Sequence, residues 1–175
     1  MIEPENEPPP LISAALWYVE QGLPVFPCKP GEKRPLTRHG LYDASLNPEL
    51  IRRWWEREPS ANIGLPTGWV FDVVDIDGYA GQLTRAAYWC DGRQDCESAS
   101  CTHGIFGQLD AKAIGKVSTP RDGGMHIYVP PSGSGNSAAL ARLTGIDFRG
   151  KGGYVIAPPS HTPHGRYMWL GEPHL

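Results

Sequence analysis

The stretch Phe71-Asp72-Val73-Val74-Asp75-Ile76-Asp77-Gly78 guides the interpretation of the whole chain. Its β-branched and apolar residues, closed by a glycine, predict a buried strand. Because side chains alternate between the two faces of a strand, Asp75 and Asp77 point to one side, and Val74 and Ile76 point into the opposite layer. Two carboxylates at the exit of a strand can hold divalent cations such as Mg²⁺, which prefers oxygen ligands. The alternative is a strand that runs into an Asp-Gly turn with both acids solvated.

Length and composition describe an ordinary globular protein with many turns. The chain has 175 residues, of which 40% are hydrophobic and 20% are charged, and it contains 21 glycines and 18 prolines. This size suits one domain. The sequence shows neither a signal peptide nor an apolar run of about 18 residues, so we expect a cytoplasmic protein with no membrane partner. The net charge of −3 means that nucleic acid could be bound only by a local basic face.

The first part of the chain predicts a flexible tail, two helices and two short strands. Residues 1–9 are acidic and proline-rich, which is typical of a flexible tail, and residues 10–21 keep helical spacing. Asn47-Pro48-Glu49 starts the second helix, which we expect to end near residue 56. We interpret its two tryptophans as packing residues rather than base-stacking ones. The short strands are predicted at residues 23–27 and 62–68.

A basic loop lies between these elements, at residues 28–40. It carries five basic side chains when its histidine is counted, and Lys33 is one of them. Such a loop either contacts the phosphates of a nucleotide or nucleic acid, or it is simply solvated.

Strand patterns recur in the second part and place further polar groups on one face. In Met125–Val129 the apolar side chains alternate with His126. In residues 145–150, Asp147 and Arg149 likewise point away from the core face. A helix is predicted at 79–89, a short helix at 137–143, and further strands at 116–119, 154–157 and 166–170. Together these elements predict an α/β or α+β fold with a mostly antiparallel or mixed sheet.

The polar groups on these strands suit phosphoryl transfer. Carboxylates can hold metal ions that bridge a triphosphate, and cations with backbone amides can balance its charge. Gly123-Gly124 would let the backbone approach a phosphate closely. Each residue also has a structural alternative: His126 as a structural or surface histidine, Asp147 as a turn residue, and Arg149 as its structural ion-pair partner.

An ordered series of motifs resembles a known family. It comprises Asp75-Ile-Asp77, Asp122-Gly-Gly-Met-His126 and Ile146-Asp-Phe-Arg-Gly-Lys-Gly-Gly-Tyr-Val-Ile-Ala-Pro-Pro-Ser160. Together with Lys33-Arg-Pro-Leu36, Trp54-Trp55 and Asn62–Gly68, it resembles the bifunctional primase/polymerase (prim-pol) domain of the archaeo-eukaryotic primase superfamily. The resemblance covers roughly residues 12–170. That family is common in the replication proteins of plasmids, phages and prophages.

The resemblance implies a catalytic domain over residues 10–175, with an RRM-like sheet unit, an N-terminal α/β unit and an active site in the cleft between them. Asp75, Asp77 and Asp147 would be the catalytic ligands of Mg²⁺ or Mn²⁺, and His126 would contact the phosphates of the incoming nucleotide. The other nucleotide-binding candidates are Gly123, Gly124, Arg149, Lys33 and Arg121. Arg121-Asp122 departs from the family, which often has a small or hydroxyl residue before the diglycine.

The activity expected from this resemblance is DNA-templated nucleotidyl transfer, as primase, polymerase or both. Its partners would be a DNA template and primer, dNTPs or NTPs, and a C-terminal helicase or helical segment in a longer protein, because the chain has no GxxxxGK[ST] motif of its own. We expect it in the nucleoid or in a phage-infected cell. The alternatives are a non-catalytic, zinc-stabilised module that binds single-stranded DNA or initiates replication, and a metal-dependent nuclease.

A Cys/His cluster predicts a second metal site. Cys90, Cys96, Cys101 and His103 offer three thiolates and one imidazole, enough to complete a tetrahedral structural Zn²⁺ site. Some members of the family carry a zinc-binding insertion near this point, so we expect one at residues 90–104. The alternative is a polar loop with reduced, uncoordinated cysteines. Cys28 is expected to be an ordinary buried thiol.

Overall fold

The computed structural model describes residues 9–87, 105–137 and 143–175. The described residues form two compact units. The first unit contains the described residues up to Leu65 together with Ile156–Tyr167, and the second contains those of Pro66–Val155 together with Met168–Leu175. Residues 1–8 of the predicted tail, most of the predicted helix at 137–143 and the whole predicted zinc-binding insertion lie outside the described residues.

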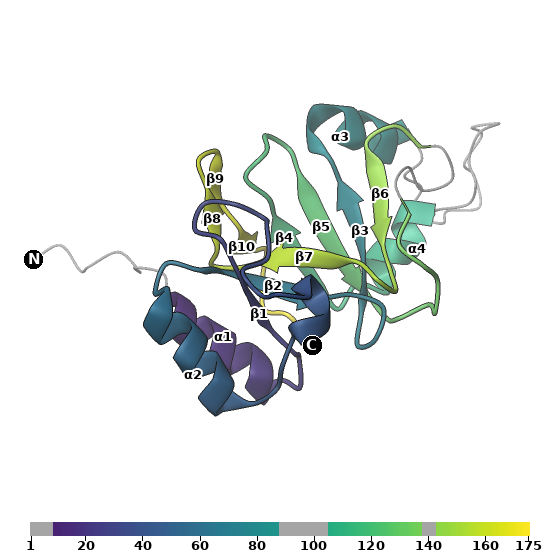
Figure 1. Cartoon of the computed structure of the whole chain (residues 1–175). Coiled ribbons are helices and arrows are strands. Elements are labelled where there is room, and N and C mark those ends of the chain that lie inside the picture. The colour runs from purple at the N-terminus through teal and green to yellow at the C-terminus, as the bar shows by residue number, and fades with distance from the viewer. Residues whose placement is uncertain (1–8, 88–104, 138–142) are drawn as a thin grey trace, which may run out of the picture. The chain divides into compact units, whose positions relative to one another are not determined.

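Two helices of the first unit, α1 (Leu11–Glu20) and α2 (Pro48–Arg57), lie side by side (Figure 1). The start of α2 confirms the sequence prediction, because Asn47 Oδ1 accepts hydrogen bonds from the backbone N–H of Glu49 at 2.9 Å and of Leu50 at 3.4 Å. This cap satisfies two of the donors that every helix leaves free at its first turn. A short 3₁₀ helix, η1 (Gly40–Asp43), precedes α2.

A three-stranded sheet has most of its residues in the first unit. Its strands, in the order β1-β2-β7, are β1 (Phe26–Cys28), β2 (Asn62–Pro66) and β7 (Tyr154–Ala157). A small hairpin of β8 (His161–Thr162) and β9 (Gly165–Arg166) follows. The buried Asn62 amide donates to the carbonyl oxygens of Glu32 at 2.9 Å and His161 at 2.7 Å, so β2 fixes both a loop and the hairpin.

The second unit is built on a five-stranded sheet in which every strand pair is antiparallel, in the order β10-β4-β5-β3-β6 (Figure 1). The elements of this unit are β3 (Asp72–Ile76), α3 (Gly78–Ala87), α4 (Ile105–Ala111), β4 (Gly115–Ser118), β5 (Met125–Val129), β6 (Ile146–Arg149) and β10 (Met168–Trp169). The prediction of an α/β or α+β fold is therefore confirmed, and of the two predicted sheet types, mostly antiparallel or mixed, this sheet is antiparallel.

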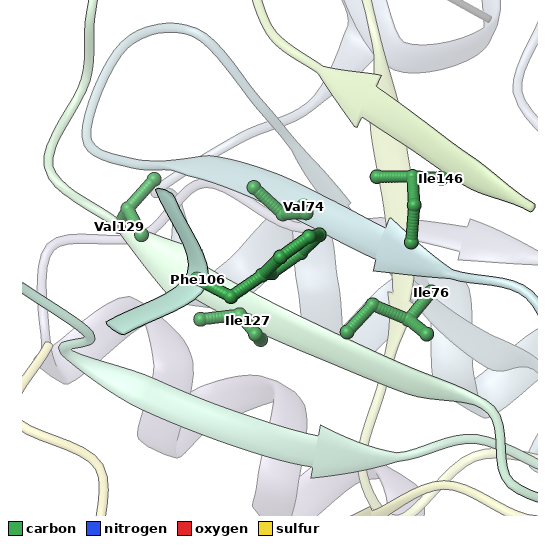
Figure 2. Close-up of a cluster of buried hydrophobic side chains, with 6 residues drawn as sticks. All are labelled: Val74, Ile76, Phe106, Ile127, Val129 and Ile146. Carbon is green, nitrogen blue, oxygen red and sulfur yellow. The ribbon is translucent and has the colours of Figure 1, made fainter. Parts of the chain in front are cut away.

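One face of this sheet carries the core on which the helices pack. The strand side chains of the core are those that the alternation predicted: Val74, Ile76, Ile127, Val129 and Ile146. Figure 2 shows the ring of Phe106, from α4, lying among them. Helix α3 approaches the same face closely, because a Cβ atom on Gly81 would lie 2.8 Å from the Ile76 side chain.

Two segments differ from what the sequence predicted. Helix α4 was not predicted, because it has only seven residues. The strand predicted at 166–170 is divided: Arg166 ends β9, Trp169 ends β10, and the two strands belong to different sheets. The buried Tyr167 lies between them and donates its backbone N–H to the Ser160 carbonyl at 2.9 Å, so the chain leaves one sheet before it joins the other.

Candidate active site

Three carboxylates meet on the face of the second unit's sheet opposite the core. Asp75, in the central strand β3, is paired in register with His126 on β5 and with Asp147 on β6. Asp77 follows the end of β3, directly before α3. One oxygen atom of each acid lies within 4.8 Å of the others. The structure thus brings together the three acids that the sequence singled out.

The cluster concentrates negative charge, and Arg149 balances part of it. Like charges directly opposite each other on neighbouring strands are destabilising, and the side chains of Asp75 and Asp147 are only 11% and 23% exposed. Arg149 Nη2 lies 3.1 Å from Asp75 Oδ2 and 2.8 Å from Asp147 Oδ2. Its guanidinium therefore bridges the two acids that the register places side by side.

Arg121 makes a more exposed ion pair at the edge of the cluster. Its Nη1 lies 3.0 Å from Asp77 Oδ1, and the two side chains are 66% and 38% exposed. Exposed pairs of this kind contribute little to stability. Arg121 therefore loses little interaction energy when it leaves Asp77 and binds another anion.

His126 is a buried neighbour of Asp75. Its side chain is 5% exposed, and its Nε2 lies 3.5 Å from Asp75 Oδ1. Tyr128 lies two residues further along the same face, with its ring centroid 6.4 Å from that of His126. His126 thus flanks the central acid on one side as Asp147 does on the other, which suits a residue that orients Asp75.

The diglycine forms the turn that carries Arg121. The Gly124 N–H donates to the Arg121 carbonyl at 2.8 Å, and the Thr119 N–H donates to the Gly124 carbonyl at 3.0 Å. Gly123 has φ +71, and a Cβ atom on Gly124 would lie 2.1 Å from Thr119 Oγ1. Both glycines are therefore required by the turn itself, and their contact with phosphate remains a prediction.

The donor set fits a hard divalent cation. Mg²⁺ and Mn²⁺ favour carboxylate and water oxygens, and the acids supply three carboxylates from neighbouring positions. Among the described residues, Asp75, Asp77 and Asp147 are the group able to hold such an ion. Because the three negative charges repel one another, a cation bound between them would stabilise the cluster.

The remaining candidates lie elsewhere. Lys33 belongs to the first unit, so its role in nucleotide binding remains a prediction. The four predicted zinc ligands all fall within residues 88–104, outside the described residues.

The other acid of the central strand, Asp72, has a different environment. Asp72 is fully buried, and its Oδ2 accepts hydrogen bonds from the Ser132 N–H and hydroxyl, both at 2.7 Å. Asp72 lies on the same strand face as Val74, so the alternation of side chains already separates it from Asp75 and Asp77. Asp72 anchors a loop rather than joining the acid cluster.

Trp54 and Trp55 differ in their surroundings. Trp55 is buried, and its indole N–H donates to the Ala61 carbonyl at 3.0 Å, which confirms the packing role predicted for it. Trp54 is half-buried and lines a pocket, which the sequence analysis missed. The spacing of Leu50, Trp54 and Arg57 along one helix face was the available signal.

In the part of the chain that the structure describes, no helix combines the length and the apolar character needed to cross a bilayer.

Comparison with known proteins identifies the family of the chain. None of the curated proteins matches the sequence. The family model of the bifunctional DNA primase/polymerase N-terminal domain matches residues 15–174. This match covers nearly the whole chain and includes every acid of the cluster, so the chain belongs to the Prim-Pol family of bifunctional DNA primase/polymerase N-terminal domains.

Proposed function

We propose that this chain is a DNA-templated nucleotidyltransferase, a DNA primase, a DNA polymerase or both, that uses Mg²⁺ or Mn²⁺. The observation that carries the proposal is the convergence of Asp75, Asp77 and Asp147 within 4.8 Å in a member of the Prim-Pol family. Its substrates would be dNTPs or NTPs and a DNA template with primer. Its setting would be plasmid, phage or prophage replication, with a C-terminal helicase or helical segment as partner.

The three acids would hold two divalent ions where the 3′-hydroxyl meets the incoming triphosphate. Bound ions would lower the pKa of that hydroxyl and stabilise the charge on phosphorus and on the departing pyrophosphate. Asp75 is the central ligand in this scheme, because it lies between His126 and Asp147 in the register. The partly buried position of the acids strengthens their interaction with a cation relative to bulk water.

Arg149 and Arg121 would bind the triphosphate. Both contacts of Arg149 with the acids use Nη2, so the donors on its other two nitrogens remain available to phosphate oxygens. Arg121 is exposed and pairs with a single acid, so it can turn toward a phosphate. Guanidinium groups bind phosphate with strong, charge-assisted hydrogen bonds. His126, beside Asp75, would keep the central carboxylate oriented.

We also propose that Cys90, Cys96, Cys101 and His103 hold a structural Zn²⁺. The donor set suits a closed tetrahedral site, with no position left open for substrate. The support for this second metal is the chemistry and clustering of these four residues.

Primer extension tests the proposed function. A labelled primer on a DNA template is incubated with dNTPs or NTPs and with Mg²⁺ or Mn²⁺, and wild type is compared with Asp147→Asn. We expect extension that follows the template sequence and falls at least about a hundredfold in the variant, since a lost metal ligand removes several kcal/mol of transition-state stabilisation. Primer shortening without nucleotides would indicate a nuclease instead. DNA binding without either reaction would indicate a non-catalytic module.

A further inference from the structure

A pocket in the first unit, remote in sequence from the acid cluster, has the features of a binding site. It has a volume of about 520 Å³, within the range of small-ligand sites. One wall is a face of α2, where Leu50, Trp54 and Arg57 recur at helical spacing. The loop residues Leu36 and Arg38 also line the pocket. With Pro27, which also lines it, the pocket thus joins one aromatic ring and three apolar side chains to two guanidinium groups.

The charged groups of the pocket differ in how far they are already engaged. Asp43 accepts hydrogen bonds from the backbone N–H of His39 at 2.8 Å and from its ring at 2.9 Å, and these bonds hold the pKa of Asp43 below its ordinary value. Among the described residues, neither Arg38 nor Arg57 makes an ion pair or side-chain hydrogen bond. Both are exposed. The pocket therefore offers two guanidinium groups without a direct ion pair, although the charge of Arg38 also acts on Asp43 and helps to lower its pKa.

This combination matches the chemistry of one nucleotide unit. Bases stack on aromatic rings and apolar surfaces irrespective of sequence, while phosphates bind to arginine. The second carboxylate of the pocket, Glu58, can accept a hydrogen bond from an N–H on the edge of a base, such as the N3–H of thymine. A purely anionic ligand would gain nothing from the indole, and a purely apolar one would leave two guanidinium groups without a role.

We propose that this pocket binds a nucleotide unit of single-stranded DNA, with the base against Trp54 and the phosphate at Arg38 and Arg57. That the strand is the template rests on the proposed function. Binding itself requires neither the acid cluster nor a divalent ion.

Anisotropy of a labelled 12-nucleotide oligo-dT, measured with EDTA and without nucleotides, tests the proposal. The key comparison has matched charge: Arg38→Gln/Arg57→Gln against Arg52→Gln/Arg53→Gln. The second pair also removes two exposed arginines from the first unit, but neither lines the pocket. We expect the pocket pair to weaken binding about tenfold and to reduce the slope of log K against log salt by about 0.7, the value for one phosphate contact on a single strand. The control pair should weaken binding less than about threefold, by a general loss of positive charge.

The indole is tested separately. We expect Trp54→Leu to weaken binding at least about fivefold and Trp54→Phe to retain most of the affinity, because a smaller ring still stacks. Thermal melting of both variants shows whether the fold is kept, and the arginine variants, which are exposed, test the pocket independently of packing.

Several results would overturn the proposal: no binding of oligo-dT, equal losses in both arginine pairs, or displacement of the strand by equimolar dTMP, which would make the pocket a free-nucleotide site. The proposed function is judged separately with Asp75→Asn/Asp147→Asn. That variant should be inactive in primer extension but bind oligo-dT as the wild type does. If the wild type binds oligo-dT through the pocket but has no polymerase activity, the pocket proposal is supported and the proposed function is wrong.

Discussion

At the scale of single residues, Arg149 pairs with two acids of the cluster. One of its nitrogens lies within 3.1 Å of Asp75 and 2.8 Å of Asp147. A divalent ion bound to these acids would neutralise the same negative charge that this guanidinium neutralises. Arg149 therefore stabilises the metal-free cluster and opposes the binding of a cation to it.

Replacement of Arg149 by Gln should separate these two effects. We expect the free energy of unfolding of the metal-free protein to fall by about 1–3 kcal/mol, because two part-buried carboxylates lose a charged partner. Mn²⁺ affinity should rise at least about threefold, since a nearby positive charge is removed. Chemical denaturation in EDTA and electron paramagnetic resonance of free Mn²⁺ measure the two quantities. Arg149→Lys, which keeps the charge, is the control, and weaker Mn²⁺ binding by the Gln variant would argue against this role.

Cys28 is a residue for which the structure predicts low reactivity. It is fully buried, and burial raises the pKa of its thiol to about 12. Only about one thiol in 10⁴ is then ionised at pH 8, and the thiolate is the reactive form. A brief pulse of iodoacetamide on the native protein, followed by peptide mass spectrometry, should leave Cys28 unmodified, whereas the unfolded protein should be labelled. Comparable labelling of Cys28 in both states would contradict its burial.

Residue faces were predictable, but residue contacts were not. The period of two in β3 was enough to place Asp75 and Asp77 on one side and Val74 on the other. The bridging position of Arg149 depends on the register between β3 and β6, which pairs Asp75 with Asp147. Register is a property of two strands far apart in sequence, so the sequence of either one does not determine it.

At the scale of elements, α4 is held by tertiary contacts rather than by its own sequence. It has seven residues, too few for a stable isolated helix. Phe106 anchors it in the core, and Asp110 lies 2.8 Å from Arg85 Nη2 on α3 and 3.1 Å from Lys116 Nζ on β4. This dependence on distant partners explains why the helix was not predicted from local patterns.

Asp110→Asn should weaken these links. Burial raises the pKa of Asp110, but the hydrogen bond from Lys116 and the charge of Arg85 are the main opposing effects, and the net pKa is lowered. The stabilisation is therefore fully present above the unfolded pKa of about 3.9 and is lost as the pH falls through the lower folded pKa. We expect the variant to lose about 1 kcal/mol of unfolding free energy at pH 7.

Urea denaturation at a series of pH values measures this effect. The difference between wild type and Asp110→Asn should shrink as the pH falls below about 4. The exposed Glu56, for which the described residues show no ion pair, provides a control as Glu56→Gln. A difference for Asp110→Asn that stays constant down to the lowest pH would show that its charge is not the cause.

The predicted insertion at residues 90–104 contains the four proposed zinc ligands. We expect purified protein to contain one zinc per chain, and Cys101→Ser to lose most of it, because a tetrahedral structural site requires all four ligands. Elemental analysis measures the content, and Cys28→Ala is the matched control, since the buried Cys28 is not one of the proposed ligands. Zinc-free wild type prepared without chelators would contradict the prediction.

For the molecule as a whole, the sequence predicted the general architecture more completely than the path of the chain. Alternating strands and capped helices were sufficient for an α/β or α+β fold with a mostly antiparallel or mixed sheet, and the family resemblance implied an N-terminal α/β unit and a sheet unit. The return of Ile156–Tyr167 to the first unit depends on long-range contacts. The pocket beside Trp54 likewise arises from residues separated in the chain, such as Leu36 and Arg57. The net charge of −3 gives no indication of the two arginines that line it.

The central claim is that the face of β3 bearing Asp75 carries the chemistry. The most direct measurement is the single-turnover rate of primer extension for Asp75→Asn beside Asp72→Asn, two identical changes on opposite faces of one strand. We predict that Asp75→Asn lowers the rate at least about a hundredfold in a folded protein, as expected for a lost metal ligand. Asp72→Asn, which alters a buried group bonded to Ser132 and outside the acid cluster, should retain the rate within about fivefold once its stability is confirmed by melting. Equal rates for wild type and Asp75→Asn would contradict the account.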